Sequence, residues 1–230
     1  KFLSSNDSIK INNVTGNLEL IGNTFVAESG PLTWEHLNKT PEELNAKLSD
    51  FTFEVNEKAF SAEQVSLNYP EIIKVPVKGF IEFRIENDSK GKVNFPMFQS
   101  YKSGYDLNFL NIEGLSLIGG VTLRGVTLGT GAMDNSLSSL ELQGTAVKKF
   151  RAESRDFTYA DSAFTSELSS VSIYQRKDSI YHPGLNLTYR ADENLLNLLK
   201  DKGNFKNTPF YASYFNMDFT ADKISWDIDS

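Results

Sequence analysis

The chain has 230 residues, of which 40% are hydrophobic and 23% are charged, and its formal net charge is −7. This composition can bury a core and is not that of a disordered tail. An acidic chain without a basic stripe repels phosphate backbones, so nucleic acid is not expected as a partner. The sequence has no cysteine, which excludes disulfides, thiolate zinc sites and a cysteine nucleophile, and mildly favours an exported bacterial protein.

The ends of the chain and its hydropathy bear on where it resides. The sequence starts at Lys1 without a methionine, and residues 227–230 end it within a strand-like alternating pattern. We therefore expect a fragment or a mature segment of a longer protein. No apolar run approaches the roughly 18–20 residues that span a bilayer. No transmembrane segment is therefore expected in this chain.

Alternation of apolar and polar residues recurs along the chain, and a period of two predicts strands with one buried and one wet face. Gly, Asn, Asp and Ser separate these runs, which favours antiparallel sheets or a solenoid. The alternating runs lie, in chain order, at 18–20, 51–55, 80–85, 107–109, 121–123, 126–128, 140–142, 171–174, 185–189 and 224–228.

Two segments carry a helical signal. Thr40, Pro41 and Glu43 form a capping box with proline at the first helical position, and we expect a short helix over 41–49. The leucine-rich stretch 194–199 fits either a short helix or a strand, and its strand-and-turn context favours the strand.

An internal similarity links residues 60–68 to 219–227, with a looser version at 150–157. Both segments share the order Phe, hydroxyl, Ala, acid, polar, β-branched, Ser, apolar and Asn or Asp. One interpretation is that strands of the same composition look alike. The other is a strand unit used repeatedly along an elongated sheet.

No residue pattern points to catalysis or to a metal. His36 and His182 are far apart, lack acids at a metal-like offset, and each is interpreted as a turn or packing residue. The glycine-rich stretch 114–131 lacks the lysine of a phosphate-binding loop, and its glycines fit turns. We therefore predict a protein that is not an enzyme, with no catalytic, cofactor-binding or metal-binding residues.

Aromatic residues are the tentative ligand contacts. Trp34, Tyr181 and Trp226, together with the aromatic cluster at 210–215, could stack against a sugar. The competing interpretation places these side chains in the core or at its rim.

Several strings, taken in order, resemble segments of very large, repeat-rich β envelope proteins of Bacteroidetes-type bacteria. They are residues 32–35 with 41–44, 60–69, 95–101, 119–120, 178–185 and 215–218, of which Asp178-Ser-Ile-Tyr-His-Pro-Gly184 is the most specific. The strand pattern around 150–174 also resembles, more weakly, the β-groove and jelly-roll proteins of outer-membrane lipid transport. The resemblance implies an exported β protein that is periplasmic or associated with the outer membrane.

The sequence thus predicts an all-β fold with one short helix. The preferred architecture is an extended twisted sheet stack of solenoid, groove or jelly-roll type, and the alternative is a compact β sandwich. Residues 1–230 are expected to form one β-rich region with a subdivision near 86–95.

The predicted function is a non-catalytic structural or interaction segment of an exported cell-envelope protein. Its expected partners are other segments of a longer chain or envelope proteins. The alternatives are a lipid-carrying β-groove and a carbohydrate-binding module, with lipid or glycan as the ligand.

Overall fold

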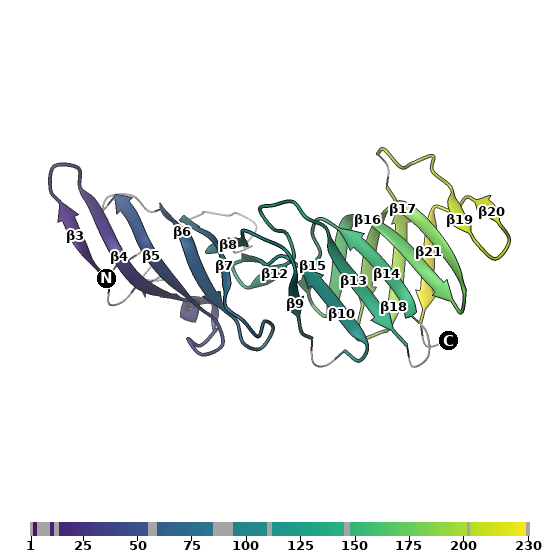
Figure 1. Ribbon diagram of the computed structural model, residues 1–230, viewed down its shortest axis with the longest axis horizontal. Helices are drawn as coiled ribbons and strands as arrows, with labels where there is room; N and C mark the ends of the chain where they lie inside the picture. Colours follow the sequence, from purple (N-terminus) through teal and green to yellow (C-terminus); the bar gives the residue numbers. More distant parts are fainter. Residues whose placement is uncertain are drawn as a thin grey trace. The chain divides into compact units, whose positions relative to one another are not determined.

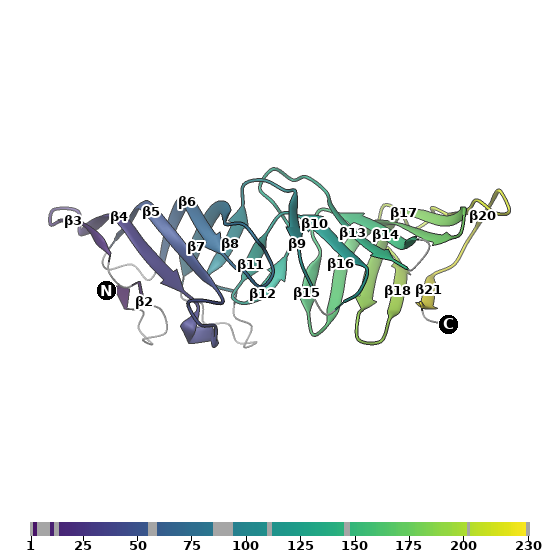
Figure 2. The ribbon, with the colours of Figure 1, turned by 60° about the horizontal axis from the view of Figure 1, so that its bottom comes forward.

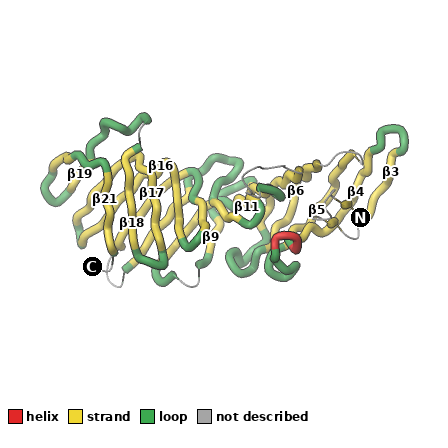
Figure 3. The backbone as a smooth tube through the Cα atoms, turned by 180° about the vertical axis from the view of Figure 1, so that it is seen from behind, coloured by secondary structure: helices red, strands yellow, loops and turns green. Residues whose placement is uncertain are grey.

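The computed structural model describes residues 2–3, 10–11, 14–54, 59–84, 94–109, 112–144, 148–201 and 203–228, with side chains described from residue 14 onward. These residues form antiparallel strands, and one 3-10 turn, η1 (Glu35–Leu37), is the single helical element among them (Figures 1 and 3). The all-β prediction is confirmed. None of the helical structure in the described ranges is long and apolar enough to cross a membrane.

The chain forms two compact units. Unit 1 comprises residues 1–102, 120–128 and 132–134, and unit 2 comprises 103–119, 129–131 and 135–230. The chain first passes between them at Lys102 and Ser103, whereas the sequence analysis expects a subdivision near 86–95. Of that expected range, residues 86–93 lie outside the described part of the chain.

Unit 1 is a meandering antiparallel sheet in which β4, β5, β6, β7, β8 and β11 are successive neighbours (Figure 2). On the outer side of β4, β3 pairs along residues 24–29 and β2 pairs at Leu32. The strands are β1 (Phe2–Leu3), β2 (Lys10–Ile11), β3 (Thr15–Glu19), β4 (Thr24–Thr33), β5 (Asn45–Glu54), β6 (Ala59–Asn68), β7 (Val77–Arg84), β8 (Met97–Ser100), β11 (Thr122–Arg124) and β12 (Thr127–Gly129), whose last residue belongs to unit 2.

Unit 2 is organised around the long hairpin of β16 and β17. Its strands are β9 (Tyr105–Leu107), β10 (Leu115–Gly119), β13 (Ser138–Gln143), β14 (Lys148–Ser154), β15 (Thr158–Ala160), β16 (Ala163–Gln175), β17 (Asp178–Arg190), β18 (Leu195–Lys200), β19 (Phe210–Ala212), β20 (Met217–Phe219) and β21 (Lys223–Asp227). The turn end of the hairpin lies between β14 and β19, and its open end lies between β15 and β18. One hairpin therefore belongs to two rows of strands.

The two rows of unit 2 pack face to face. Phe150 on β14 contacts Tyr189 on the open end of β17, with ring centroids 5.2 Å apart, and both side chains are fully buried. Unit 2 thus has two packed layers, as in the predicted alternative of a β sandwich. Long strands shared by both layers join them, as in the preferred prediction of an extended twisted sheet.

The long strands bend where two consecutive side chains point away from the core. If side chains alternated strictly through such a pair, the apolar residues beyond it would face solvent. The second outward residue is an extra one, and it returns the following apolar residues to the core side. Such pairs are Glu28-Ser29, Ser49-Asp50, Glu63-Gln64 and Glu167-Leu168. In β6 and β16 the register with the neighbouring strand shifts at these residues.

Side-chain hydroxyls satisfy backbone groups at two of these bends. At the β6 bend, the backbone N–H of Gln64 donates to the Tyr101 hydroxyl at 2.8 Å. At the β16 bend, the Ser154 hydroxyl donates to the carbonyl oxygen of Leu168 at 2.8 Å, and Ser154 Oγ lies 2.7 Å from Ser166 Oγ. Because an unpaired buried polar group is costly, the Ser154 hydroxyl stabilises the β16 bend, whereas the Tyr101 hydroxyl caps an exposed N–H at the β6 bend.

The predicted helix over 41–49 is wrong. The capping box does form, since the Thr40 N–H donates to Glu43 Oε2 at 2.8 Å and the Glu43 N–H to Thr40 Oγ1 at 3.4 Å. The chain makes one turn there and enters β5 at Asn45. Ala46 and Leu48 alternate into the core of unit 1, so tertiary burial outweighs local helix propensity.

Two other expectations concern strands. The stretch 194–199 is a strand, since β18 runs from Leu195 to Lys200. The two similar segments differ in structure: 60–68 lies within the continuous strand β6, whereas 219–227 starts on the last residue of β20 and continues into β21 after a break.

Ser154→Ala should lower the free energy of unfolding by about 1–3 kcal/mol, because it leaves the carbonyl of Leu168 and the hydroxyl of Ser166 without their buried partner. Ser139→Ala is the matched control, since Ser139 Oγ is buried without a partner and its removal should be nearly neutral. Urea denaturation followed by far-UV circular dichroism measures both. Equal effects of the two substitutions would contradict the role of Ser154.

Candidate functional site

The three predicted contact aromatics occupy different environments. Trp34 is fully buried in unit 1, where its indole N–H donates to the carbonyl oxygen of Gly125 at 3.0 Å. Tyr181 and Trp226 belong to unit 2, where Tyr181 is exposed and Trp226 is half-buried on β21 opposite Leu196. Trp34 is therefore a core residue, which corrects its assignment as a ligand contact.

Tyr181 is one of four exposed aromatic residues of this part of unit 2, and we define Tyr181, Tyr211, Tyr214 and Phe215 as the aromatic patch. Tyr181 and Tyr211 are cross-strand partners on β17 and β19, and Tyr214 and Phe215 are in edge-to-face contact in the turn before β20. Tyr214 and Phe215 are 72% and 68% exposed. Exposed apolar side chains that lie together in this way are typical of interaction surfaces.

A second exposed apolar surface lies at the β3 edge, defined as Leu18, Leu20 and Ile21. β3 lies at the end of the sheet of unit 1 and pairs with β4 alone among the described strands, so its other side has no partner strand within the described ranges (Figure 1). All five residues of β3 are exposed, and Leu20 and Ile21 in the following turn are 79% and 104% exposed. The strand Thr15–Glu19 contains none of the Lys or Pro residues that commonly protect an edge.

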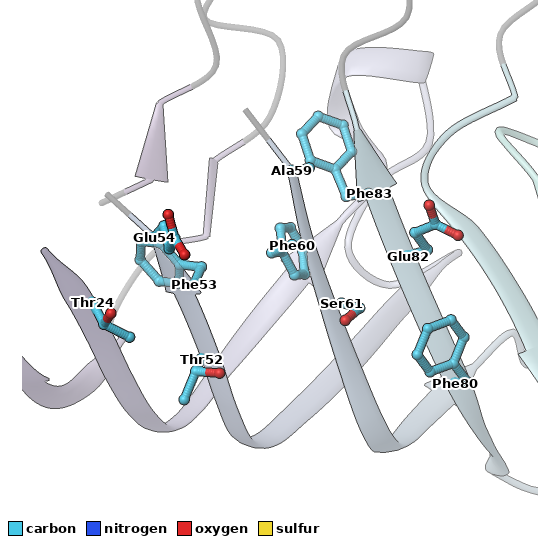
Figure 4. A pocket seen from close by; sticks show the side chains of 10 residues that line it. All are labelled: Thr24, Thr52, Phe53, Glu54, Ala59, Phe60, Ser61, Phe80, Glu82 and Phe83. Atoms are coloured by element: carbon cyan, nitrogen blue, oxygen red, sulfur yellow. The ribbon is translucent and has the colours of Figure 1, made fainter. Parts of the chain in front are cut away.

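A pocket of about 460 Å³ lies on four neighbouring strands of unit 1 (Figure 4). Its ten lining residues come from β4, β5, β6 and β7: Thr24, Thr52, Phe53, Glu54, Ala59, Phe60, Ser61, Phe80, Glu82 and Phe83. Its volume falls within the range of about 300–1,000 Å³ that is typical of small-molecule sites.

Strand register explains how the pocket receives its polar lining. Thr24 pairs with Glu54, and Ser61 pairs with Glu82, so each pair projects from the same face of its two strands. These residues alternate with core residues such as Phe60, which is 5% exposed. The polar part of the lining therefore belongs to the wet face of the sheet.

The apolar part of the pocket adjoins an aromatic ladder across the same strands, consisting of Phe25, Phe53, Phe51, Phe60 and Phe83. Successive ring centroids along this ladder are 5.4, 6.2, 6.0 and 5.7 Å apart. Offset and tilted contacts at these distances are favourable and hold the rings in fixed positions. The ladder lies on the core side of the sheet, since Phe51, Phe60 and Phe83 are buried, so it supports these strands from behind and Phe80 is the aromatic of the wet face.

No sequence pattern predicted this pocket, although one of its residues interrupts the alternation of its strand. In the alternating run 80–85, Ile81 and Phe83 are the buried residues, so Phe80 lies on the wet face beside Glu82. A single apolar side chain on the wet face is common on protein surfaces, so Phe80 alone did not identify a site, and its strand neighbours had to be known.

The carboxylates of the pocket have no counter-ion within the described ranges. Neither Glu54 nor Glu82 forms an ion pair there, whereas Glu141 on the sheet of unit 2 contacts both Lys148 and Arg151. The two pocket carboxylates therefore keep their capacity to accept hydrogen bonds.

His182 is a structural residue in the core of unit 2. It is fully buried, the backbone N–H of Gly184 donates to Nδ1 at 3.1 Å, and Nε2 lies 3.1 Å from the carbonyl oxygen of Thr208. This pattern fits a neutral ring that carries its proton on Nε2. Burial, followed by the nearby charge of Lys200, lowers the pKa of His182 below its ordinary value of 6.5.

The described ranges contain no group of three or more His, Cys, Asp or Glu side chains that could hold a metal ion. Comparison with protein-family models, with curated proteins and with solved structures gave no match to this chain. Conclusions about its function therefore rest on the residues themselves.

Acidification should destabilise unit 2 through His182. Because its folded pKa is lowered, the unfolded state binds the proton more readily, and stability is lost as the pH falls below 6.5. The expected slope for this residue is at most about 1.4 kcal/mol per pH unit. His182→Gln, which can form both hydrogen bonds without titrating, should be less stable at neutral pH but have a flatter pH dependence.

Urea denaturation between about pH 7.5 and 5.5 measures this slope for each variant. His36→Gln serves as the comparison, because burial also lowers the pKa of His36. This substitution should reduce the pH dependence of the free energy of unfolding by a separate amount. Parallel curves for the wild type and His182→Gln would refute the assignment.

Proposed function

We propose that this chain is a non-catalytic structural and interaction segment of an exported bacterial cell-envelope protein. In this proposal it is periplasmic or associated with the outer membrane, and its β3 edge pairs with an extended strand of a neighbouring β segment. The observation that carries the proposal is the unprotected, apolar β3 edge. The exported location rests on the cysteine-free sequence and on the resemblance described above.

The chemistry of the β3 edge favours a strand as its partner. An edge strand presents alternating N–H and C=O groups, which another extended chain can satisfy completely. Leu18 on β3 and Leu20 and Ile21 in the turn that follows are all exposed, so a strand paired at this edge would also bury apolar area. At about 25 cal/mol per Å² of buried apolar surface, such contacts add to the main-chain hydrogen bonds.

The aromatic patch on unit 2 supports the same proposal independently. Tyrosine and phenylalanine side chains offer large contact areas at low entropic cost, and they are enriched in protein interfaces. A chain with exposed apolar surfaces on both of its units is suited to contacts with other β segments.

The lipid-carrying alternative has less support. Carriage of an acyl chain needs unfilled apolar space, yet the inward side chains of unit 1 are already packed. Those of Leu32, Leu48, Val65, Leu67, Val77 and Ile81 are each 0% exposed. We therefore favour interaction over carriage.

Replacing Leu18 and Leu20 together by lysine should abolish strand pairing at the β3 edge, because inserted charge is a common protection of edge strands. The wild-type chain should self-associate as its concentration rises, since a second copy offers the same edge, and the double variant should remain monomeric. Sedimentation velocity over a series of concentrations measures this difference.

Val75→Lys combined with Leu168→Lys is the matched control, since these two residues are 56% and 48% exposed and neither belongs to the β3 edge. The control should associate like the wild type. A wild-type chain that stays monomeric throughout, or an equal loss of association in the control, would count against the proposal.

A further inference from the structure

We infer that the pocket of unit 1 is a binding site for a short neutral carbohydrate. This inference is independent of the β3 edge, because the pocket residues Thr52, Ser61, Phe80 and Glu82 are not part of that edge. It follows from the lining of the pocket, from its charge and from its size.

The lining is amphipathic in the way that a sugar ring is amphipathic. Phe80, half-buried on the wet face of β7, offers apolar surface, and Ala59 lines the same pocket. The hydroxyls of Thr24, Thr52 and Ser61 lie among them in the same pocket (Figure 4). A sugar ring has apolar C–H faces and a rim of hydroxyls, so it can use both kinds of surface at once.

Glu54 and Glu82 are suited to hold sugar hydroxyls. A carboxylate is an acceptor with two oxygens, and a neighbouring pair of sugar O–H groups can donate to both. Hydrogen bonds to a charged acceptor are stronger than neutral ones. Neither glutamate is held in an ion pair within the described ranges, so both can bind a ligand without first breaking an ion pair.

The charge of the pocket selects against the competing ligands. The two carboxylates and the net charge of −7 repel phosphorylated or acidic sugars. An acyl chain would desolvate the carboxylates and hydroxyls without returning hydrogen bonds, which is unfavourable. A neutral polyhydroxylated ligand avoids both costs.

The volume of about 460 Å³ and the position on an exposed face set further limits. A pocket of this size holds a short saccharide, and a wet face lets a longer glycan extend beyond it. Affinity should be modest, in the range of about 1 mM for a single sugar, because an open site buries little of its ligand.

The test uses the intact chain and a defined set of probes: glucose, galactose, mannose, N-acetylglucosamine and their β-linked disaccharides. Saturation-transfer difference NMR and titration calorimetry should detect saturable binding of at least one neutral probe. Glucose 6-phosphate and octanoate, tested alongside, should bind at least several-fold more weakly.

Phe80→Ala should weaken binding about tenfold, since it removes the aromatic surface that faces the sugar. If Phe80→Ala fails to fold, Phe80→Leu is the variant to test. Glu82→Gln should weaken binding less than the Phe80 variant, because an amide still accepts a hydrogen bond. Phe215→Ala is the matched control, as it removes an exposed phenylalanine in the other unit and should leave binding unchanged.

Three outcomes would overturn the inference. They are no saturable binding by any neutral probe, unchanged binding in the folded Phe80 variant, and stronger binding of octanoate or glucose 6-phosphate than of the neutral sugars. Loss of sugar binding in Phe215→Ala with none in the Phe80 variant would place the carbohydrate at the aromatic patch and would equally refute the pocket.

Discussion

The structure depends on one constraint: a strand that bends must still direct its apolar side chains to the same core. Side chains alternate strictly in a regular strand, so each bend includes two consecutive outward residues. In β6 these residues are Glu63 and Gln64, and Ala62 and Val65 on either side are both buried. The same solution in β16 lets one hairpin serve two packed rows of strands.

The bends account for several features that otherwise look unrelated. Each bend frees backbone groups, and Tyr101 and Ser154 supply the hydroxyls that satisfy them in units 1 and 2. Acidic residues such as Glu28 and Asp50 are suited to the outward positions because carboxylates are poorly tolerated in a core. The acids at these bends thus fit the outward positions that strand geometry creates.

The two proposed sites use what a bent open sheet leaves unburied. The inward faces are filled by side chains of the same unit, so ligands and partners must use the wet face or the edges. The β3 edge offers backbone groups and apolar side chains to a strand, while the wet face near Phe80 offers hydroxyls, carboxylates and an aromatic ring to a small ligand.

Local pattern was sufficient to predict the all-β class and, within the described residues, the strands around 51–54, 80–84 and 185–189, because alternation reports burial directly. It failed at Thr40–Glu43, where a genuine capping box leads into strand β5, since propensity is weaker than the burial of Ala46 and Leu48. It also failed at Trp34, whose indole N–H meets Gly125, a partner 91 positions along the chain. Wet-face neighbours such as Ser61 and Glu82 are likewise brought together by strand register alone. Register depends on turns, bulges and long-range packing, and a local window of sequence does not contain these contacts.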